Sequence, residues 1–160
     1  MVSAKTSKIW WGGLTGLEED IRSLGYQAHT FLGIYDVAVL FQRNTFEKIA
    51  TDIERVKELK GVAKMTPYSV VKEKGTPFVI QPFAYVFTQT VPSMEEKVVD
   101  ELSRQRGVVA SSIVHGPYDV ISEVEANSLE KFVEIYKNMG VPGVVMHNPH
   151  IRVPNEINKL

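Results

Sequence analysis

Two short segments of the sequence carry side chains that could bind a small charged molecule. They are Gly116-Pro117-Tyr118-Asp119 and Gly33-Ile34-Tyr35-Asp36. In each, the aspartate carboxylate can pair with an amino group, and the tyrosine ring offers an apolar wall with a polar tip. Both begin with the glycine that suits a tight corner between two strands. An Asp in such a corner also accepts hydrogen bonds from its own turn, so a structural role for Asp36 and Asp119 stays equally open.

Three histidines raise the alternative of a zinc or copper site. They are His115, His147 and His150, and Met146 lies beside the second of them. Imidazoles suit zinc or copper, and a thioether favours copper(I). Positions 147 and 150 of a regular strand face opposite sides, although Asn148-Pro149 could bend the chain. Compact Cys/His spacings are missing, so we predict ordinary histidines and neither a metal nor another cofactor.

The composition argues against several classes of protein. The 160 residues include no cysteine, which excludes disulfides, thiolate metal sites and thiol nucleophiles. A net charge of −1 offers no broad basic field, so direct nucleic-acid binding is disfavoured. No apolar run approaches the length of a membrane span, and the first eight residues do not resemble a signal peptide. We expect a cytoplasmic protein that does not enter membranes.

The two corner segments belong to an internal repeat. They lie 83 residues apart, and the alignment of residues 33–49 with residues 116–132 contains 7 identities in 17 pairs. Average residue usage predicts roughly one identity by chance in an alignment of this length. We therefore predict two related units, residues 1–74 and residues 83–160, joined by a polar linker at residues 75–82.

Each predicted unit has the order β-α-β-β-α-β. In the first unit the expected strands are 8–11, 26–32, 35–41 and 62–71, and the expected helices begin at capping patterns at Thr15 and Thr45. In the second unit the expected strands are 83–88, 108–115, 120–125 and 143–153, and the expected helices begin near Ser93 and Ser128.

This order predicts the α+β class, with two ferredoxin-like units that each place two helices on one face of a four-stranded antiparallel sheet. Strand residues are apolar on both faces, as Val37, Ala38, Val39 and Leu40 show. One layer of helices covers only one face, so we predict that the two sheets pack together as a pseudo-dimer of the dimeric α+β barrel type.

Some dimeric α+β barrels are enzymes, and catalysis is a second alternative. Trp10, Trp11, Tyr85 and Phe87 could line a cavity, although core positions explain them equally simply. No nucleophile, base and orienting group form a recognisable set. We predict that the protein is not an enzyme.

The second half resembles the effector-binding domain of the leucine-responsive and asparagine-responsive regulators, the Lrp/AsnC family. The resemblance rests on residues 83–86, on the segment 114–120 around the corner, on residues 126–130 and on Gly143-Val144. The first half is similar to a degenerate copy, which keeps residues 33–37 and 44–47. The resemblance thus covers nearly all of the chain as a tandem duplication of the domain.

The resemblance implies a function in small-molecule binding. Members of that family bind effectors, often amino acids, where these corners meet neighbouring subunits, which here implies Gly116, Pro117, Tyr118 and Asp119, and also Gly33, Ile34, Tyr35 and Asp36. Complete regulators carry a helix-turn-helix before this domain, for which the sequence leaves no room. We therefore expect a homo-oligomer that regulates by ligand-linked assembly, or by contact with a DNA-binding relative.

Overall fold

The computed structural model describes residues 2–6, 11–75 and 82–153, and its helices and antiparallel strands confirm the α+β class. The chain divides into two compact units. The first runs to Tyr68, and the second comprises Ser69–Arg152.

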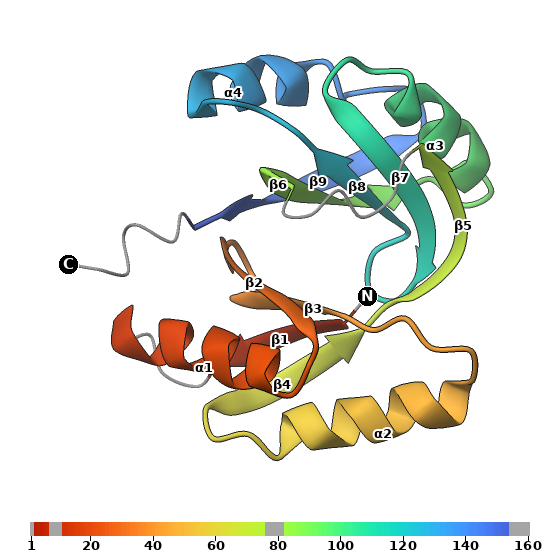
Figure 1. Ribbon diagram of the computed structural model, residues 1–160. Coiled ribbons are helices and arrows are strands. Elements are labelled where there is room, and N and C mark those ends of the chain that lie inside the picture. The colour runs from red at the N-terminus through yellow and green to blue at the C-terminus, as the bar shows by residue number, and fades with distance from the viewer. Residues whose placement is uncertain (1, 7–10, 76–81, 154–160) are drawn as a thin grey trace. The chain divides into compact units, whose positions relative to one another are not determined.

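The first unit is an antiparallel sheet with two helices. Its strands lie in the order β4-β1-β3-β2. Its elements are β1 (Val2–Thr6), α1 (Trp11–Ser23), β2 (Gln27–Leu32), β3 (Val37–Leu40), α2 (Phe46–Lys57) and β4 (Val62–Pro67). Both helices lie on one side of the sheet (Figure 1). Ile21 of α1 and Val56 of α2 pack there against Val37 and Val39 of β3. The apolar faces of the two helices therefore cover this side of the sheet.

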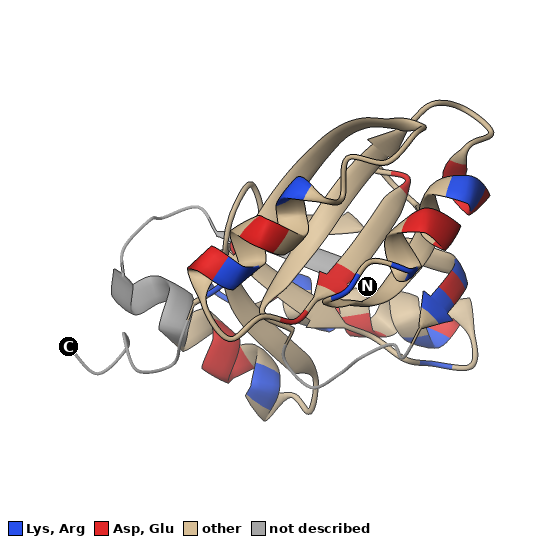
Figure 2. Ribbon diagram, turned by 90° about the horizontal axis from the view of Figure 1, so that it is seen from above, with Lys and Arg blue, Asp and Glu red and all other residues tan. Residues whose placement is uncertain are grey.

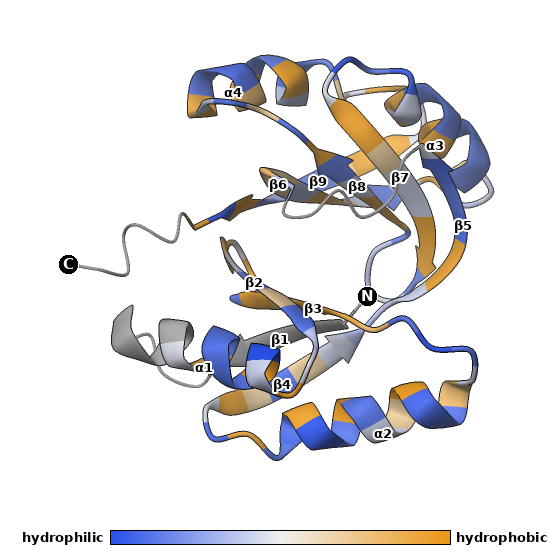
Figure 3. Ribbon diagram, in the orientation of Figure 1, coloured by the Kyte–Doolittle hydropathy of each residue, from blue (hydrophilic) through white to orange (hydrophobic). Residues whose placement is uncertain are grey.

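The second unit has the same order of elements after one additional strand, β5 (Ser69–Gly75). The further elements are β6 (Ala84–Thr90), α3 (Glu95–Ser103), β7 (Val108–His115), β8 (Val120–Val124), α4 (Leu129–Lys137) and β9 (Val144–Arg152). Within the unit the strands lie in the order β9-β6-β8-β7-β5. Helices α3 and α4 lie on one side of this sheet, and Figure 3 shows hydrophobic and hydrophilic residues alternating along α4.

The core of the second unit lies between its sheet and its helices. Ala84 and Val86 of β6 pack there with Val98 of α3 and Phe132 of α4. Successive strand residues point to opposite faces, so Tyr85 and Phe87 face away from the helices. The sequence thus sets two chemically different faces on one strand.

The strand expected at 62–71 is wrong as a single element. The chain changes partner at Tyr68, so that β4 pairs with β1, whereas β5 pairs with β7. A continuous run of strand-forming residues gives no sign of where the pairing changes. The boundary between the units therefore falls after Tyr68 rather than after residue 74, and most of the predicted linker, residues 76–81, lies outside the described residues.

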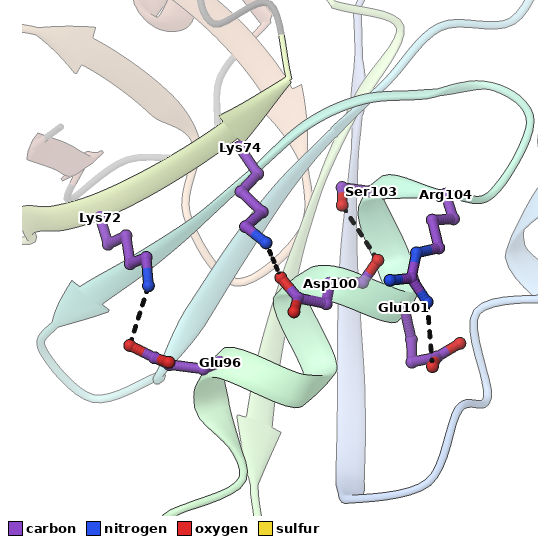
Figure 4. A network of polar contacts seen from close by, with 7 residues as sticks. All are labelled: Lys72, Lys74, Glu96, Asp100, Glu101, Ser103 and Arg104. Atoms are coloured by element: carbon purple, nitrogen blue, oxygen red, sulfur yellow. Dashed lines mark hydrogen bonds and ion pairs between the residues drawn. The ribbon is translucent and has the colours of Figure 1, made fainter.

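Two lysines of β5, just before the predicted linker, form ion pairs with α3. Lys72 Nζ lies 2.9 Å from Glu96 Oε1, and Lys74 pairs with Asp100 of the same helix, α3. Figure 4 shows both lysines reaching from β5 to α3. Exposed pairs of this kind contribute little stability each, up to about 1 kcal/mol. They do fix which face of β5 is turned toward α3.

The strand expected at 8–11 lies almost wholly outside the described residues, and its one described residue, Trp11, is helical. The first described strand is β1, at residues 2–6. The sequence of β1 alternates only weakly. Its place between β3 and β4 supplies hydrogen bonds on both edges, so tertiary pairing overrides local propensity.

Two of the predicted helix caps are confirmed and two are wrong. Thr15 does not begin a helix, because it lies inside α1, which begins at Trp11. The hydroxyls of Thr45 and Ser128 accept the backbone N–H groups of Lys48, at 3.3 Å, and of Lys131, at 3.1 Å. At α3 the N-cap is Met94, and it forms no side-chain cap. Ser93 instead has a φ of 69° and donates its N–H to Glu95 Oε1.

The surface of the described chain mixes charges of both signs. Figure 2 shows positive and negative residues side by side along the helices, while long stretches of strand carry neither. Among the described helices, none has the length and apolar character needed to cross a lipid bilayer.

We predict that Gly75→Ala destabilises the second unit. Gly75 has a φ of 100°, and an added Cβ would lie 2.2 Å from the backbone oxygen of Val109 in β7. A strand backbone cannot move aside as a flexible side chain can, so we expect a loss of at least about 2 kcal/mol in unfolding free energy, measured by urea denaturation. Gly140→Ala is the matched control, because nothing lies within 4 Å of its added Cβ. Equal stability of the two variants would contradict the pairing of β5 with β7.

Candidate functional site

The corner at residues 116–119 joins β7 to β8 and is closed by its own backbone. The Val114 N–H donates to the Asp119 carbonyl at 2.9 Å. The first corner repeats this bond, because the Phe31 N–H donates to the Asp36 carbonyl at 2.8 Å. The repeat detected in the sequence therefore preserves the geometry of the corner.

The Asp119 carboxylate has a structural task in the second unit. Its Oδ2 atom accepts the backbone N–H of Thr90 at 2.8 Å and lies 3.4 Å from the Thr90 hydroxyl. The Asp119 N–H donates to the Thr88 carbonyl. These bonds fasten the corner to the end of β6, so the structural alternative for Asp119 has direct geometric support.

The tyrosines of the two corners also form contacts inside their own units. Tyr118 is buried, its hydroxyl accepts the Asn148 amide at 3.0 Å, and its ring packs edge-on against Phe87. Tyr35 lies with its hydroxyl 2.6 Å from that of Tyr68. The remaining corner residues, Gly33, Ile34, Gly116 and Pro117, are exposed. In each corner the glycine and the residue after it are therefore exposed, while the tyrosine contacts other residues of the same unit.

A row of three ionisable residues crosses the helix-free face of the second unit. The strand register places Tyr85 of β6 directly opposite Glu123 of β8 on one side and His150 of β9 on the other. We call Glu123, Tyr85 and His150 the polar row. Directly paired strand residues have Cβ atoms about 5 Å apart, so the three groups are neighbours. All are buried, with exposed fractions of 4%, 6% and 1%.

Burial shapes the protonation of the polar row. It raises the pKa of the Tyr85 phenol, and the nearby Glu123 carboxylate raises this pKa further. Burial also lowers the pKa of His150, whose Nδ1–H donates to the Asn148 carbonyl at 3.2 Å. Near neutral pH the row therefore holds a neutral phenol and a neutral imidazole beside a carboxyl group.

The polar row is connected to the corner through one aromatic ring. Phe87 lies 4.6 Å from the His150 ring and 5.7 Å from the Tyr118 ring, measured between centroids. Tyr118 in turn forms part of the corner. A change at the row can therefore reach the corner through direct side-chain packing.

The sequence interpretation missed the polar row as a set. The residue pattern offers Tyr85 and Phe87 only as core or cavity residues, and His150 only as an ordinary histidine or, in the alternative, a metal ligand. Glu123 went unnoticed inside a strand whose other residues are mainly apolar. A charged residue in a short buried strand was the signal that could have drawn attention to this face.

The structure does not bring the three histidines of the metal alternative together. His147 lies on the helix-covered face, where its Nε2–H donates to the Met139 carbonyl and its Nδ1 accepts from the Thr88 hydroxyl, both at 2.8 Å. His150 lies on the opposite face, and His115 is exposed at the end of β7. Within residues 2–6, 11–75 and 82–153, no three His, Asp or Glu residues are grouped as metal ligands.

We predict that Asp119→Ala lowers the unfolding free energy by about 1–3 kcal/mol, because the buried Thr90 N–H loses its acceptor. Asp119→Asn keeps an acceptor oxygen and should lose less. Urea denaturation of both variants measures the difference. The control is His115→Ala, an exposed neighbour that should change stability by no more than about 0.5 kcal/mol. An unchanged stability of Asp119→Ala would refute the structural role.

We predict that acid destabilises the protein partly through His147 and His150. Burial lowers both pKa values below the usual 6.5, so the unfolded chain binds protons that the folded chain does not. Their contribution is complete above pH 6.5 and is lost as the pH falls through the lowered folded values. Urea denaturation at a series of pH values should show that the unfolding free energy falls less steeply on acidification in His147→Gln and in His150→Gln than in the wild type. Identical pH profiles for the three proteins would contradict this.

Comparisons with known proteins do not assign the chain to a family. No family model matches it, and no curated protein matches it. One solved structure, described as a major regulator of staphylococcal pathogenesis, is similar over 96% of this chain and 99% of its own, with 11% sequence identity and a TM-score of 0.49. At this level of similarity the match carries no statement about function.

Proposed function

We propose that the protein binds a small polar effector on the helix-free face of its second unit, at the polar row and beside the 116–119 corner. The observation that carries this proposal is the burial of a carboxyl group, a phenol and an imidazole in one row. Burying ionisable groups costs free energy, and a hydrophobic face would be more stable without them. Such groups are therefore concentrated at functional sites.

The chemistry of this face suits a ligand with both polar and apolar parts. Glu123 supplies an acceptor for an amino group, and the Tyr85 hydroxyl supplies a donor or an acceptor. Phe87 and Ile121, which lie opposite each other in the next row of the sheet, supply an apolar surface. An amino-acid-like effector has these features, which agrees with the resemblance to the leucine-responsive regulators.

The corner provides a route from ligand to regulation. Phe87 contacts both His150 and Tyr118, and the exposed Gly116 and Pro117 lie at the surface where another subunit or a partner protein could bind. A ligand that favours one arrangement of the corner stabilises whichever assembly uses that arrangement. We propose that the output is assembly into a homo-oligomer or contact with a DNA-binding relative.

The topology supports the finer interpretation of the fold. In the first unit the strand order β4-β1-β3-β2 corresponds to the order 4-1-3-2 of a ferredoxin-like sheet, and β9-β6-β8-β7 has the same order in the second. We propose that both units are ferredoxin-like copies of one ancestral domain. Membership of the Lrp/AsnC family and sheet-to-sheet packing stay predictions.

Acid–base catalysis is the second candidate, and the polar row is the observation that favours it. An imidazole and a carboxyl group flank a phenol, and these are the common types of proton donor and acceptor in enzymes. The binding proposal requires the ligand to leave unchanged, whereas catalysis requires a product. Mass analysis of the ligand after incubation with the protein separates the two.

Native mass spectrometry of gently purified protein tests the binding proposal, because it reports the subunit count and any retained ligand together. We expect a defined oligomer that carries an organic mass, and we expect that mass to be lost in Glu123→Gln and in Tyr85→Phe. Glu130→Gln is the matched control, since Glu130 is exposed on α4. Retention of the mass by both row variants, or a protein that neither carries nor binds any metabolite, would refute the proposal.

A further inference from the structure

A pocket of about 560 Å³ lies in the second unit, with a lining that includes no residue of the polar row or of the corner. It is bounded by the turn before β7, by the segment after β8 and by α4. Its polar lining includes Arg106, Glu125, Asn127, Lys131 and Glu134. Its volume falls within the usual range of small-molecule sites. None of these residues belongs to the site proposed above.

The floor of the pocket is held in place by close packing. A Cβ on Gly107 would lie 2.3 Å from Cδ1 of Ile135, so the turn before β7 rests directly on α4. The Glu125 N–H donates to the Gly107 carbonyl at 2.9 Å, which ties the end of β8 to the same turn. The pocket is therefore pre-formed by three elements of one unit.

Glu125 lines this pocket and has one unsatisfied carboxyl oxygen. Its Oε1 atom is buried and accepts no hydrogen bond from the described residues. Burial also raises the pKa of this carboxyl group, and Arg152 only partly opposes the shift. A buried acceptor without a donor costs about 1–3 kcal/mol. Since the terminal torsion of a glutamate is broad, the carboxyl group can turn toward a donor that enters the pocket.

The pocket has two cationic residues, and only one of them is available to bind an anion. Lys131 Nζ lies 2.7 Å from Glu134 Oε2, so this pair is internally neutralised. Arg106 is exposed and forms no ion pair with the part of the chain that the structure describes. A glutamate with one carboxyl oxygen that lacks a donor and an exposed arginine therefore line the same pocket.

We propose that this pocket binds a small zwitterion, with its ammonium group at Glu125 and its carboxylate at Arg106. Free amino acids are the simplest molecules of this class. An ammonium group supplies the missing donors to Glu125, and a guanidinium can bind a carboxylate through two parallel hydrogen bonds. This site is independent of the polar row, so either proposal can fail without the other.

Isothermal titration of the full-length protein with each standard L-amino acid tests the proposal. We expect at least one to bind, and we expect its N-acetyl and methyl-ester derivatives to bind at least about tenfold more weakly, because each lacks one of the two charges. Glu125→Gln and Arg106→Gln should each weaken the binding of the unmodified amino acid, also by about tenfold. Glu125→Gln should not weaken the binding of the N-acetyl derivative any further, because that derivative has no ammonium group to contact Glu125.

Matched controls come from neighbouring exposed residues of the same charge, Glu130→Gln and Arg104→Gln, which should bind as the wild type does. The urea midpoint of each variant shows that folding is retained. Absence of binding by every amino acid would overturn the proposal, as would wild-type affinity in both Glu125→Gln and Arg106→Gln. Loss of binding only in Glu123→Gln would assign the amino acid to the polar row and would also overturn it.

Discussion

The hydrogen-bonded register of β6 between β8 and β9 is the constraint on which the second unit depends. It places Ala84 and Val86 under the helices, where they form the core, and it places Tyr85 and Phe87 on the opposite face. A slip of one residue would exchange these two sets and bury the phenol of Tyr85 among the aliphatic side chains of the helix-covered core. The same register therefore determines both the core of the unit and the composition of its helix-free face.

The two faces of this sheet differ in chemical character, because one is mainly aliphatic and the other carries buried ionisable residues. The helix-covered face gains free energy by removing aliphatic side chains from water, and His147, which is half-buried on this face, has both ring nitrogens occupied by hydrogen bonds. The helix-free face instead buries three ionisable residues, Glu123, Tyr85 and His150, side by side. Selection for stability alone would not place three ionisable groups there, which is why we attribute this face to ligand binding.

The sequence predicted those parts of the fold that depend on local signals. The repeated corners, the caps at Thr45 and Ser128 and the alternation of β6 all follow from residue type and spacing. Strand β1 and the change of partner at Tyr68 depend on long-range pairing, which leaves little trace in local composition. Likewise, Tyr118 and Asp119 were identified as site candidates by motif, but their engagement by Asn148 and Thr90 depends on neighbouring strands. The polar row required the register itself, since its three members lie far apart in the sequence.

The central claim is that the polar row contacts a ligand, and a crystal structure of the full chain with its co-purified metabolite tests this most directly. The account predicts a small molecule on the helix-free face of the second unit, with its polar atoms within hydrogen-bonding distance of Glu123 and Tyr85. A structure in which the metabolite binds elsewhere, while the three row side chains bond only to protein groups, would contradict it.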